Sequence, residues 1–537
     1  MQRKGSGTCC PFRQSLIRPS QPPPSSSASS ACSAVMNSAL RLLRPATRVP
    51  WRCDTWAWAR KRAGITRTYA EVAVVPAAEL RFGQPLHETH PHLLKAGEVT
   101  PGITALEYHQ RRAALAKELP PNSVAILAAN DLKYASGAVF YKFHQDPDFL
   151  YLTGFKEQDA LAIIEKHEDN EHTFHLYVRP KDPRVEAWEG PRSGVVAAED
   201  VFNADVSGSI DHLPRFLPEI VNRVQNIYTD LPQNRVSKNL LSRYLAGTEP
   251  SRTGGIYTAF RDSPASIKPL RPLLNELRLI KSDAEIKNMR HAGQHSGRAI
   301  TDAMRQSFTT EKELDSFLDY WFKQDSCDGP AYVPVVAGGI NANTIHYVSN
   351  DMQLNPEHLV LVDAGAQYGG YVTDITRTWP VSGKFSPAQK DLYNVLLAVQ
   401  RSCISLCRTD SQFSLDKLHH TASHSLAQGL KDLGFDMSSP DAIHTLFPHH
   451  VGHYVGLDVH DSPGLSRSRP LEKNMCVTVE PGIYVPDDER WPKWARGIGI
   501  RIEDSVCVDE ESPYVLTTEA VKEVVDIEAL RGSETKI

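Results

Sequence analysis

The sequence predicts two folded parts, an α/β domain over residues 70–250 and an α+β domain over residues 272–537. In the first part, short buried-strand patterns alternate with helical patterns. In the second, capped amphipathic helices accompany strands and turn glycines, as in helices packed on an antiparallel sheet. A length of 537 residues is ample for two hydrophobic cores.

A basic leader, residues 1–69, precedes both domains and holds a single acid, Asp54. Its Pro- and Ser-rich stretch, residues 19–34, predicts disorder because such a composition cannot bury a core. From Met36, a candidate second start site, arginines alternate with apolar residues up to Arg67, which is typical of a mitochondrial presequence. We therefore expect a mitochondrial protein, in the matrix or on the matrix side of the inner membrane. The alternative is a disordered basic tail.

The first domain is predicted from three strand patterns, at residues 124–129, 160–164 and 174–178. Helical patterns lie between them, which favours an α/β arrangement. A stretch rich in Gly, Pro, Ser and Thr follows, and we assign residues 251–271 to a linker.

The second domain opens with helix signals. Capping boxes predict three helices, which begin at Ser282, Thr310 and Ser386. A fourth helix is expected over residues 415–433, with Gly434 ending it. Strand patterns fill residues 359–378, 476–480 and 498–503.

Composition excludes several classes of function. The net charge of −5 includes the basic leader, so the rest of the chain is strongly acidic, which disfavours nucleic-acid binding. No uninterrupted apolar run approaches the ~20 residues of a membrane-spanning helix, so we expect a soluble or peripherally attached protein. The cysteines after the leader contain no C-x-x-C pair, which predicts reduced thiols rather than a disulfide framework.

Residues 359–378 form a predicted hairpin that carries two acids, Asp363 and Asp374. With Tyr368-Gly369 as the loop, the two acids are directly opposite, with Cβ atoms roughly 5 Å apart. Carboxylates that close repel each other, and a bound cation is the natural compensation. With Gly369-Gly370 as the loop, we expect both acids to point to water.

More acidic and imidazole groups follow downstream. Glu480 and Glu503 each end a predicted strand, and four histidines gather between them and the hairpin: His449, His450, His453 and His460. Position 450 is not Glu, so the zinc-protease H-E-x-x-H pattern is absent. A three-histidine zinc site is an alternative, but it leaves the carboxylates unexplained. Four carboxylates and one imidazole suit two divalent ions, which can share a water, lower its pKa and support hydrolysis.

The phrases around these residues resemble the aminopeptidase P (peptidase M24B) family, which shares the pita-bread fold with prolidases and methionine aminopeptidases. The phrases are Val-Asp-Ala-Gly, Thr-Asp-Ile-Thr-Arg-Thr, Gly-Leu-Asp-Val-His-Asp, Val-Glu-Pro-Gly-Ile-Tyr and Gly-Ile-Arg-Ile-Glu-Asp. Residues 143–155 are similar to the family's N-terminal-domain signature. Residues 83–93 and 448–454 resemble the mitochondrial intermediate-cleaving peptidases of fungi. The resemblance implies a C-terminal pita-bread (creatinase/aminopeptidase) domain after a smaller α/β domain.

The resemblance also implies a site with two divalent metal ions, usually Mn²⁺. The implied ligands are Asp363, Asp374, His453, Glu480 and Glu503, and their presence favours the Tyr368-Gly369 loop. Three histidines are expected to line the substrate pocket, steady the scissile carbonyl and handle protons: His346, His449 and His460. Glu480 is expected to take a proton from the attacking water. Arg501 is expected to orient a ligand carboxylate, the alternative being a structural ion pair.

The implied function is a metallo-aminopeptidase that removes one N-terminal residue from imported mitochondrial proteins after presequence cleavage. A general Xaa-Pro aminopeptidase is the main alternative, and a binding protein on a catalytically dead pita-bread fold is a further one. The expected partners are peptide or protein N-termini and no nucleic acid. The resemblance also suggests a homodimer formed through the N-terminal domains.

Overall fold

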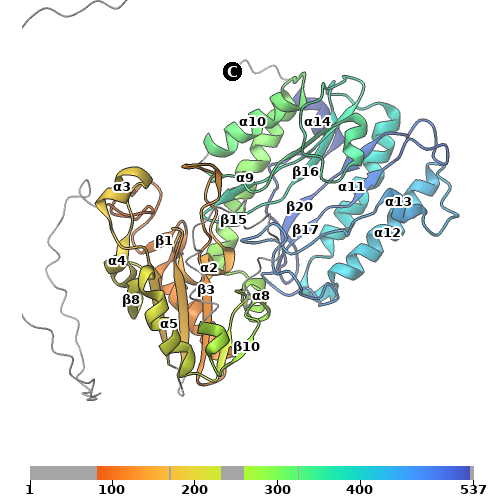
Figure 1. Cartoon of the computed structure of the whole chain (residues 1–537). Helices are drawn as coiled ribbons and strands as arrows, with labels where there is room; N and C mark the ends of the chain where they lie inside the picture. Colours follow the sequence, from red (N-terminus) through yellow and green to blue (C-terminus); the bar gives the residue numbers. More distant parts are fainter. Residues whose placement is uncertain (1–80, 168–170, 232–258, 325, 532–537) are drawn as a thin grey trace, which may run out of the picture. The chain divides into compact units, whose positions relative to one another are not determined.

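The structure is a computed structural model that describes residues 81–167, 171–231, 259–324 and 326–531 (Figure 1). All of these residues fall within one compact unit, Val74–Ile537. The predicted leader and the first part of the predicted linker lie outside the described residues. Among the residues described, no helix is both long enough and apolar enough to cross a membrane.

The N-terminal part is built on a six-stranded sheet. Its strands are β3 (Ser123–Ala128), β6 (Leu161–Lys166), β7 (His172–Val178), β8 (Val206–Ser209), β9 (Asn226–Tyr228) and β10 (Ser266–Lys268). They lie in the order β10-β9-β3-β6-β7-β8. The central strands β3, β6 and β7 are antiparallel, while β9 is parallel to β3 and β8 is parallel to β7. The three predicted strands are therefore present as β3, β6 and β7.

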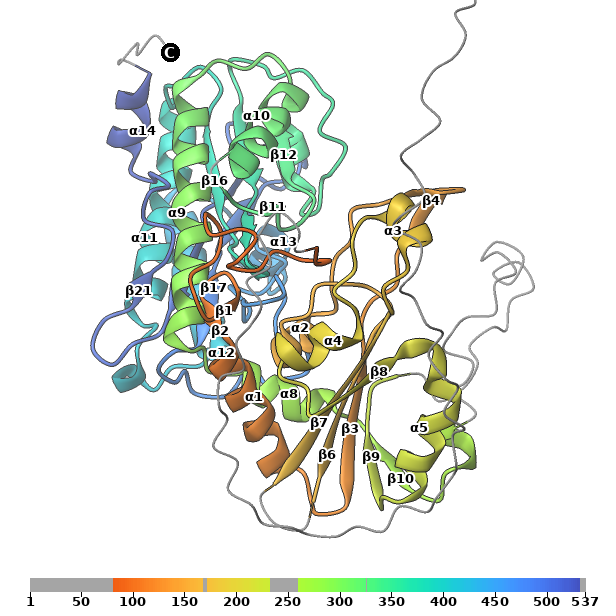
Figure 2. The ribbon, with the colours of Figure 1, turned by 90° about the vertical axis from the view of Figure 1, so that its left-hand side faces the viewer.

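Helices cover both faces of this sheet. They are α1 (Ala105–Glu118), α2 (Pro147–Thr153), α4 (Gly194–Asp200) and α5 (Leu213–Asn222), while the short helix α3 (Pro183–Glu189) buries none of its residues. Alternate residues of β3 face opposite sides: Ala125 joins the core with α1 and α2, and Ile126 joins the core with α5. Figure 2 shows α1 and α5 on opposite sides of the strands. Two small hairpins complete this part: β1 (Glu98–Thr100) with β2 (Ile103–Thr104), and β4 (Tyr134–Ser136) with β5 (Val139–Phe140).

The range predicted as a linker contains part of this sheet. Residues 266–268 form β10, which pairs in parallel with β9, and Ile267 packs against the core beside α5. The surrounding turn-forming residues hid this strand because three residues are too few to show a period. Helix α8 (Arg271–Leu279) follows directly.

The C-terminal part combines helices with small antiparallel sheets (Figure 1). Its helices are α9 (Asp283–Arg305), α10 (Glu311–Gln324), α11 (Pro387–Ser405), α12 (Leu415–Asp432), α13 (Ala442–Leu446) and α14 (Val524–Leu530). Its strands are β11 (Gly329–Pro330), β12 (Val335–Gly338), β13 (Leu359–Asp363), β14 (Ala366–Tyr368), β15 (Tyr371–Val372), β16 (Thr376–Pro380), β17 (Cys476–Val479), β18 (Gly482–Tyr484), β19 (Gly499–Arg501), β20 (Asp504–Cys507) and β21 (Tyr514–Val515).

The predicted capping boxes are present at the starts of α9, α10 and α11. One hydrophobic core joins helices to strands, with Leu396 of α11 in the same cluster as Val362 of β13 and Val477 of β17. The predicted helix over residues 415–433 is α12, and Gly434 follows it with φ of +90°. The α+β prediction is confirmed.

The hairpin loop differs from the one predicted. Strands β14 and β15 pair Tyr368 with Tyr371, so the loop is Gly369-Gly370 rather than Tyr368-Gly369. Both glycines have positive φ, +60° and +91°. A type I′ loop requires positive φ at both positions, which glycine adopts without strain and tyrosine does not.

The corrected register still keeps Asp363 and Asp374 on one face. When the loop shifts by one residue, the partner of each strand residue shifts by two positions. Side chains of a strand alternate between its two faces, so a shift of two positions keeps the same side chains on the same face. Asp363 therefore pairs with Thr376, and Asp374 becomes a diagonal neighbour, typically roughly 7 Å away. The predicted direct opposition is wrong. The alternative that sends both acids to water is also wrong, because Asp374 is buried and Asp363 is half-buried.

Candidate metal centre

The five residues predicted as metal ligands converge where strands end. Asp363 ends β13, Asp374 precedes β16, Glu480 follows β17 and Glu503 precedes β20, while His453 lies in the loop before β17. Asp374, His453 and Glu503 each offer a ligand atom, and these atoms lie within 4.8 Å of one another. His453 Nε2 is 3.5 Å from Asp374 Oδ2 and 3.4 Å from Glu480 Oε1.

Tyr332 links the two aspartates of the hairpin. Its hydroxyl lies 2.6 Å from Asp363 Oδ1 and 2.5 Å from Asp374 Oδ1. Burial and both acids raise the pKa of Tyr332 well above its usual value, so the hydroxyl keeps its proton and donates it. Sequence analysis missed this residue because it stands between β11 and β12, more than thirty positions before the nearer acid, in no phrase that marks it.

Burial and mutual repulsion shift the protonation of the acids. Burial, followed by the charge of Asp374, raises the pKa of Asp363 to about 6. Burial raises the pKa of Glu480 to about 7, although His453 opposes the shift. The pKa of Glu503 is also raised well above its usual value, by burial and then by neighbouring carboxylates. At His453 the carboxylates outweigh burial and raise the pKa to about 9. Such a cluster favours a bound cation.

Glu503 shows that a metal fits the residues present. Its Oε1 atom is buried and has no hydrogen-bond partner among the described residues, while Oε2 accepts from Thr376 Oγ1 at 2.6 Å. A buried carboxylate oxygen without a partner costs free energy, and a cation would supply the partner. Carboxylates with one imidazole suit divalent ions such as Mn²⁺.

Removing the metal is expected to make the stability of the protein fall as the pH rises. The folded-state pKa values of Asp363 and Glu480, about 6 and about 7, exceed the unfolded values of roughly 4. The folded state therefore binds more protons between about pH 4 and pH 7, and loses stability as they leave. Thermal unfolding of EDTA-treated protein at about pH 5 and pH 7.5 measures this, with metal-loaded protein as the control. A metal-free protein that is equally stable at both values would contradict it.

The histidines predicted to line the substrate pocket share one cavity. This cavity, of about 460 Å³, is lined by His346, His449 and His460 beside Glu480 and His453. The ring of His460 stands edge-on to that of His453, with 4.4 Å between centroids. Apolar residues line the same cavity: Ile345, Leu415 and Leu465.

His449 is held at both ring nitrogens. Nδ1 lies 2.9 Å from His450 O, and Nε2 lies 2.8 Å from the Tyr484 hydroxyl. A carbonyl only accepts, so Nδ1 donates and Nε2 accepts from Tyr484. Burial lowers the pKa of His449 to about 3, which keeps the ring neutral. Sequence analysis missed Tyr484 as a site residue, although it stands in the Val-Glu-Pro-Gly-Ile-Tyr phrase.

Arg501 forms an ion pair with Asp363, one of the two acids of the hairpin. Its guanidinium donates to Asp363 Oδ2 at 2.7 Å, to Tyr484 Oη at 2.8 Å and to Thr376 Oγ1 at 3.0 Å. The residue is buried. This ion pair with Asp363 is compatible with both predicted roles of Arg501, orientation of a ligand carboxylate and a structural ion pair.

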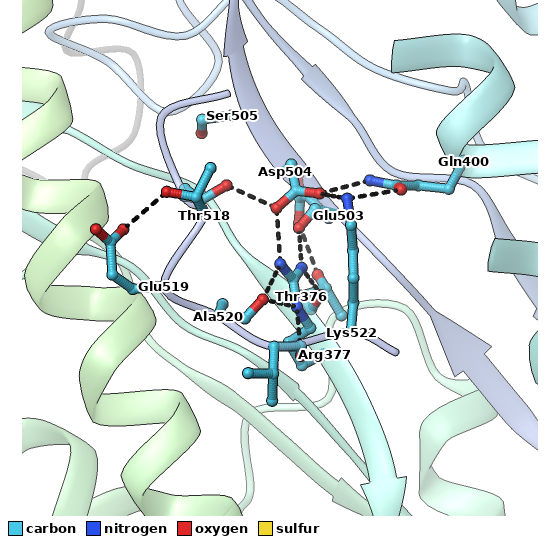
Figure 3. Close-up of polar contacts among 12 residues, drawn as sticks. Thr376, Arg377, Gln400, Glu503, Asp504, Ser505, Thr518, Glu519, Ala520 and Lys522 are labelled. Atoms are coloured by element: carbon cyan, nitrogen blue, oxygen red, sulfur yellow. Dashed lines mark hydrogen bonds and ion pairs between the residues drawn. The ribbon is translucent and has the colours of Figure 1, made fainter. Parts of the chain in front are cut away.

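A second buried ion cluster, centred on Asp504, supports Glu503 (Figure 3). Asp504 accepts from Arg377 Nη2 at 2.7 Å, from Lys522 Nζ at 2.6 Å and from Gln400 Nε2 at 2.7 Å. Arg377 also donates to the backbone oxygen of Glu503. The cluster therefore fixes the backbone that carries Glu503.

Comparisons with known proteins agree with this geometry. The family model described as "Metallopeptidase family M24" matches residues 287–510, and the one described as "Aminopeptidase P, N-terminal domain" matches residues 108–228. "Intermediate cleaving peptidase 55" of Saccharomyces cerevisiae is 47% identical over 465 residues, which cover 85% of this chain and 90% of that protein. "Xaa-Pro aminopeptidase 3" of Homo sapiens is 36% identical, over 84% of this chain and 90% of that protein.

Solved structures show the same similarity. The crystal structure of Icp55 from Saccharomyces cerevisiae has a TM-score of 0.73 and 43% identity, and the match covers 81% of this chain and 99% of that one. Aminopeptidase P from E. coli with the inhibitor Pro-Leu has a TM-score of 0.72 and 32% identity, over 80% of this chain and 98% of that one. Because the similarity spans both parts of the chain and includes the carboxylate cluster, this protein belongs to metallopeptidase family M24 and is a metallo-aminopeptidase of the aminopeptidase P type.

Proposed function

We propose that this chain removes one N-terminal residue from proteins imported into mitochondria, after their presequences have been cleaved. The cavity of about 460 Å³ carries the proposal, because Glu480 and His453 line it together with apolar side chains. Such a lining suits an apolar or aromatic N-terminal residue, such as Tyr, Leu or Phe. The similarity to two fungal proteins named "Intermediate cleaving peptidase 55" supports the same function.

We assign two divalent ions, Mn²⁺ in the first instance, to the carboxylate cluster. In this proposal the residues that would hold the ions are Asp363, Asp374, His453, Glu480 and Glu503. When bound, such ions lower the pKa of an attacking water and polarise the scissile carbonyl. Metal analysis of the purified protein by mass spectrometry tests both the number and the identity of the ions.

Glu480 handles the proton of the attacking water in this proposal. It lines the cavity, with Oε1 3.4 Å from His453 Nε2 and Oε2 3.8 Å from His449 Nδ1. Its carboxylate therefore faces the space that a substrate enters. A positioned carboxylate can take the proton from the water and return it to the leaving amine.

We assign different roles to the three pocket histidines, His346, His449 and His460. His346 is exposed at the cavity and His460 lines it, so both can donate to the carbonyl of a bound peptide. His449 already shares both ring nitrogens with His450 and Tyr484. In this proposal His449 orients Tyr484, which in turn accepts from Arg501 at 2.8 Å.

Matched peptides test the proposal. The purified chain with Mn²⁺ is expected to release tyrosine from a peptide that begins Tyr-Ala, and to release no second residue. The same peptide with Pro in the second position is the comparison. Cleavage confined to the Pro peptide would contradict the proposal. In cells, mitochondrial proteins should retain one extra N-terminal Tyr, Leu or Phe when this protein is removed.

A general Xaa-Pro aminopeptidase is the second candidate. The observation that favours it is the similarity to proteins named "Xaa-Pro aminopeptidase 3", at 36–38% identity in three mammals. The same pair of peptides decides between the two functions, because only the residue after the scissile bond differs.

The proposal includes a location and an assembly. The leader, residues 1–69, would be the presequence of a protein in the matrix or on the matrix side of the inner membrane. The domains would span residues 70–250 and 272–537, and the protein would form a homodimer with peripheral membrane contact. Carbonate extraction of mitochondria tests the membrane contact, and light scattering of the purified protein tests the dimer.

A further inference from the structure

Arg278, near the end of α8, is the centre of a buried ion cluster outside the metal centre. Its Nη1 donates to Asp148 Oδ1 at 2.6 Å, and its Nη2 donates to Asp458 Oδ2 at 2.7 Å. Nη2 also donates to Asp461. The Arg278 side chain is 3% exposed, and those of Asp148 and Asp461 are 8% and 1% exposed, so little solvent screens these two contacts, whereas Asp458 is half-buried. One side chain thus joins three carboxylates.

Two of these carboxylates flank His460 in the sequence. Asp458 and Asp461 lie on either side of that residue, whose ring lines the substrate cavity. Lys281 also holds Asp461 close to Arg278. Its Nζ donates to Asp461 Oδ2 at 2.8 Å and to Arg278 O at 2.7 Å. The loop that carries His460 is therefore tied to α8 on both sides of the histidine.

Further contacts tie the end of this loop to the same helix. Asn275 Nδ2 donates to Pro463 O at 2.6 Å, and Ser462 Oγ donates to Asn275 O at 3.3 Å. Ser462 has φ of +50°, an unfavourable value for serine that the surrounding contacts must hold. The path of the loop thus depends on α8.

The third carboxylate comes from the other part of the chain. Asp148 lies in α2, within the range matched by the N-terminal-domain model, whereas Asp458 and Asp461 lie in the range matched by the M24 model. A second contact joins the same helices, since the Tyr151 hydroxyl donates to Leu277 O at 3.0 Å. Arg278 therefore connects the N-terminal part to the loop of a pocket histidine.

We propose that Arg278 is a positioning residue that fixes the loop carrying His460, and that Asp148 in turn fixes Arg278. A planar guanidinium presents its donors in a rigid fork, so the position of one acceptor constrains the positions of the others. Asp148 of the N-terminal part thereby contributes to the geometry of the active site from outside the lining of the substrate cavity. The catalytic part of this inference rests on the proposed function, whereas its structural part does not.

The test uses the full chain with Mn²⁺ and the variant Asp148→Asn, which keeps the side-chain shape and removes the charge. We expect faster hydrogen exchange at the amides of residues 456–461, where Gly456 N–H donates to Asp458 O and Asp461 N–H donates to Tyr454 O. We also expect kcat to fall about tenfold or more, since small misplacements of active-site groups are costly. Bound metal should stay at the wild-type level, because Asp148 contacts none of the five predicted ligands in the described residues.

Glu165→Gln is the matched control. Glu165 is a buried acid of the N-terminal part that pairs with Arg223 at 2.6 Å and not with α8. Its variant should change neither the loop exchange nor kcat by more than about twofold, although it also removes the charge of a buried, ion-paired carboxylate. Arg278→Lys, which keeps the charge but loses the fork, should act like Asp148→Asn, and the double variant should be no worse than Arg278→Lys alone.

Three results would overturn the inference. They are unchanged loop exchange in Asp148→Asn, changed exchange without a loss of kcat, and additive losses in the double variant. If the wild-type protein cleaves no peptide, the proposed function fails by itself. The exchange measurement then still decides whether Asp148 and Arg278 hold the loop, because it needs no substrate.

Discussion

Asp374→Asn is expected to lower kcat by at least about 10³-fold and to reduce the bound metal. Asp374 lies between the Tyr332 hydroxyl, at 2.5 Å, and His453 Nε2, at 3.5 Å. Asparagine has nearly the same shape, but an amide nitrogen replaces one carboxylate oxygen and the negative charge is lost. Metal ions contribute several kcal/mol to such hydrolyses, and each tenfold in rate corresponds to about 1.4 kcal/mol. Steady-state kinetics and metal analysis on the same preparations measure both effects.

Asp351→Asn is the control for this substitution. Asp351 is exposed and belongs to the same half of the chain, so its variant should keep activity and metal content within about twofold of wild type. An Asp374→Asn protein with full activity would rule out the metal centre as the site of catalysis. A wild-type protein that binds no metal and cleaves no peptide would instead favour the binding-protein alternative.

Much of the candidate site could be predicted because its residues stand in short local phrases. Asp363 and Asp374 stand in a hairpin pattern, and Glu480 and Glu503 each end a strand pattern. Such a strand pattern and its acid can be recognised in the sequence without knowing which strands pair with each other. The structure accordingly brings together Asp374, His453 and Glu503, which sequence analysis had grouped without knowing their distances.

The residues that sequence analysis missed act across long separations. Tyr332 contacts Asp374 over 42 positions, and Arg278 contacts Asp148 over 130 positions. Neither residue stands in a sequence motif that marks it. Each reaches its partner because distant elements pack together. An arginine in an amphipathic helix is ordinarily expected on the surface, so the burial of Arg278 had no local signal.

The hairpin shows a different limit. The Gly369-Gly370 pair itself favours a type I′ loop, but the predicted loop was chosen from the assumed opposition of the two acids. The acids proved able to share a donor from a diagonal arrangement, through Tyr332. Convergence of the carboxylates was therefore predictable, whereas the exact pairing needed the backbone geometry of Gly369 and Gly370.

Asp504→Asn is expected to lower the free energy of unfolding by about 3–5 kcal/mol. Asp504 is buried between two cations, Arg377 and Lys522, which hold its pKa below the usual range although burial opposes them. An asparagine would turn an amide N–H toward one of these donors and leave both cations without a counter-charge. Urea unfolding of metal-free protein measures the loss without the added stabilisation from bound metal.

The control is Glu523→Gln, which breaks the more exposed ion pair between Arg401 and Glu523. That change should cost less than about 1 kcal/mol, because solvent already screens the pair. Each variant removes a carboxylate from at least one ion pair, but only Asp504 is fully buried. The comparison therefore separates the effect of burial on the free energy of unfolding from the effect of losing an ion pair. Asp504→Asn should also weaken Mn²⁺ binding, because Arg377 would lose the partner that fixes it against the backbone of Glu503. If both variants cost the same and Mn²⁺ binds equally, the backbone of Glu503 is held by its strands alone.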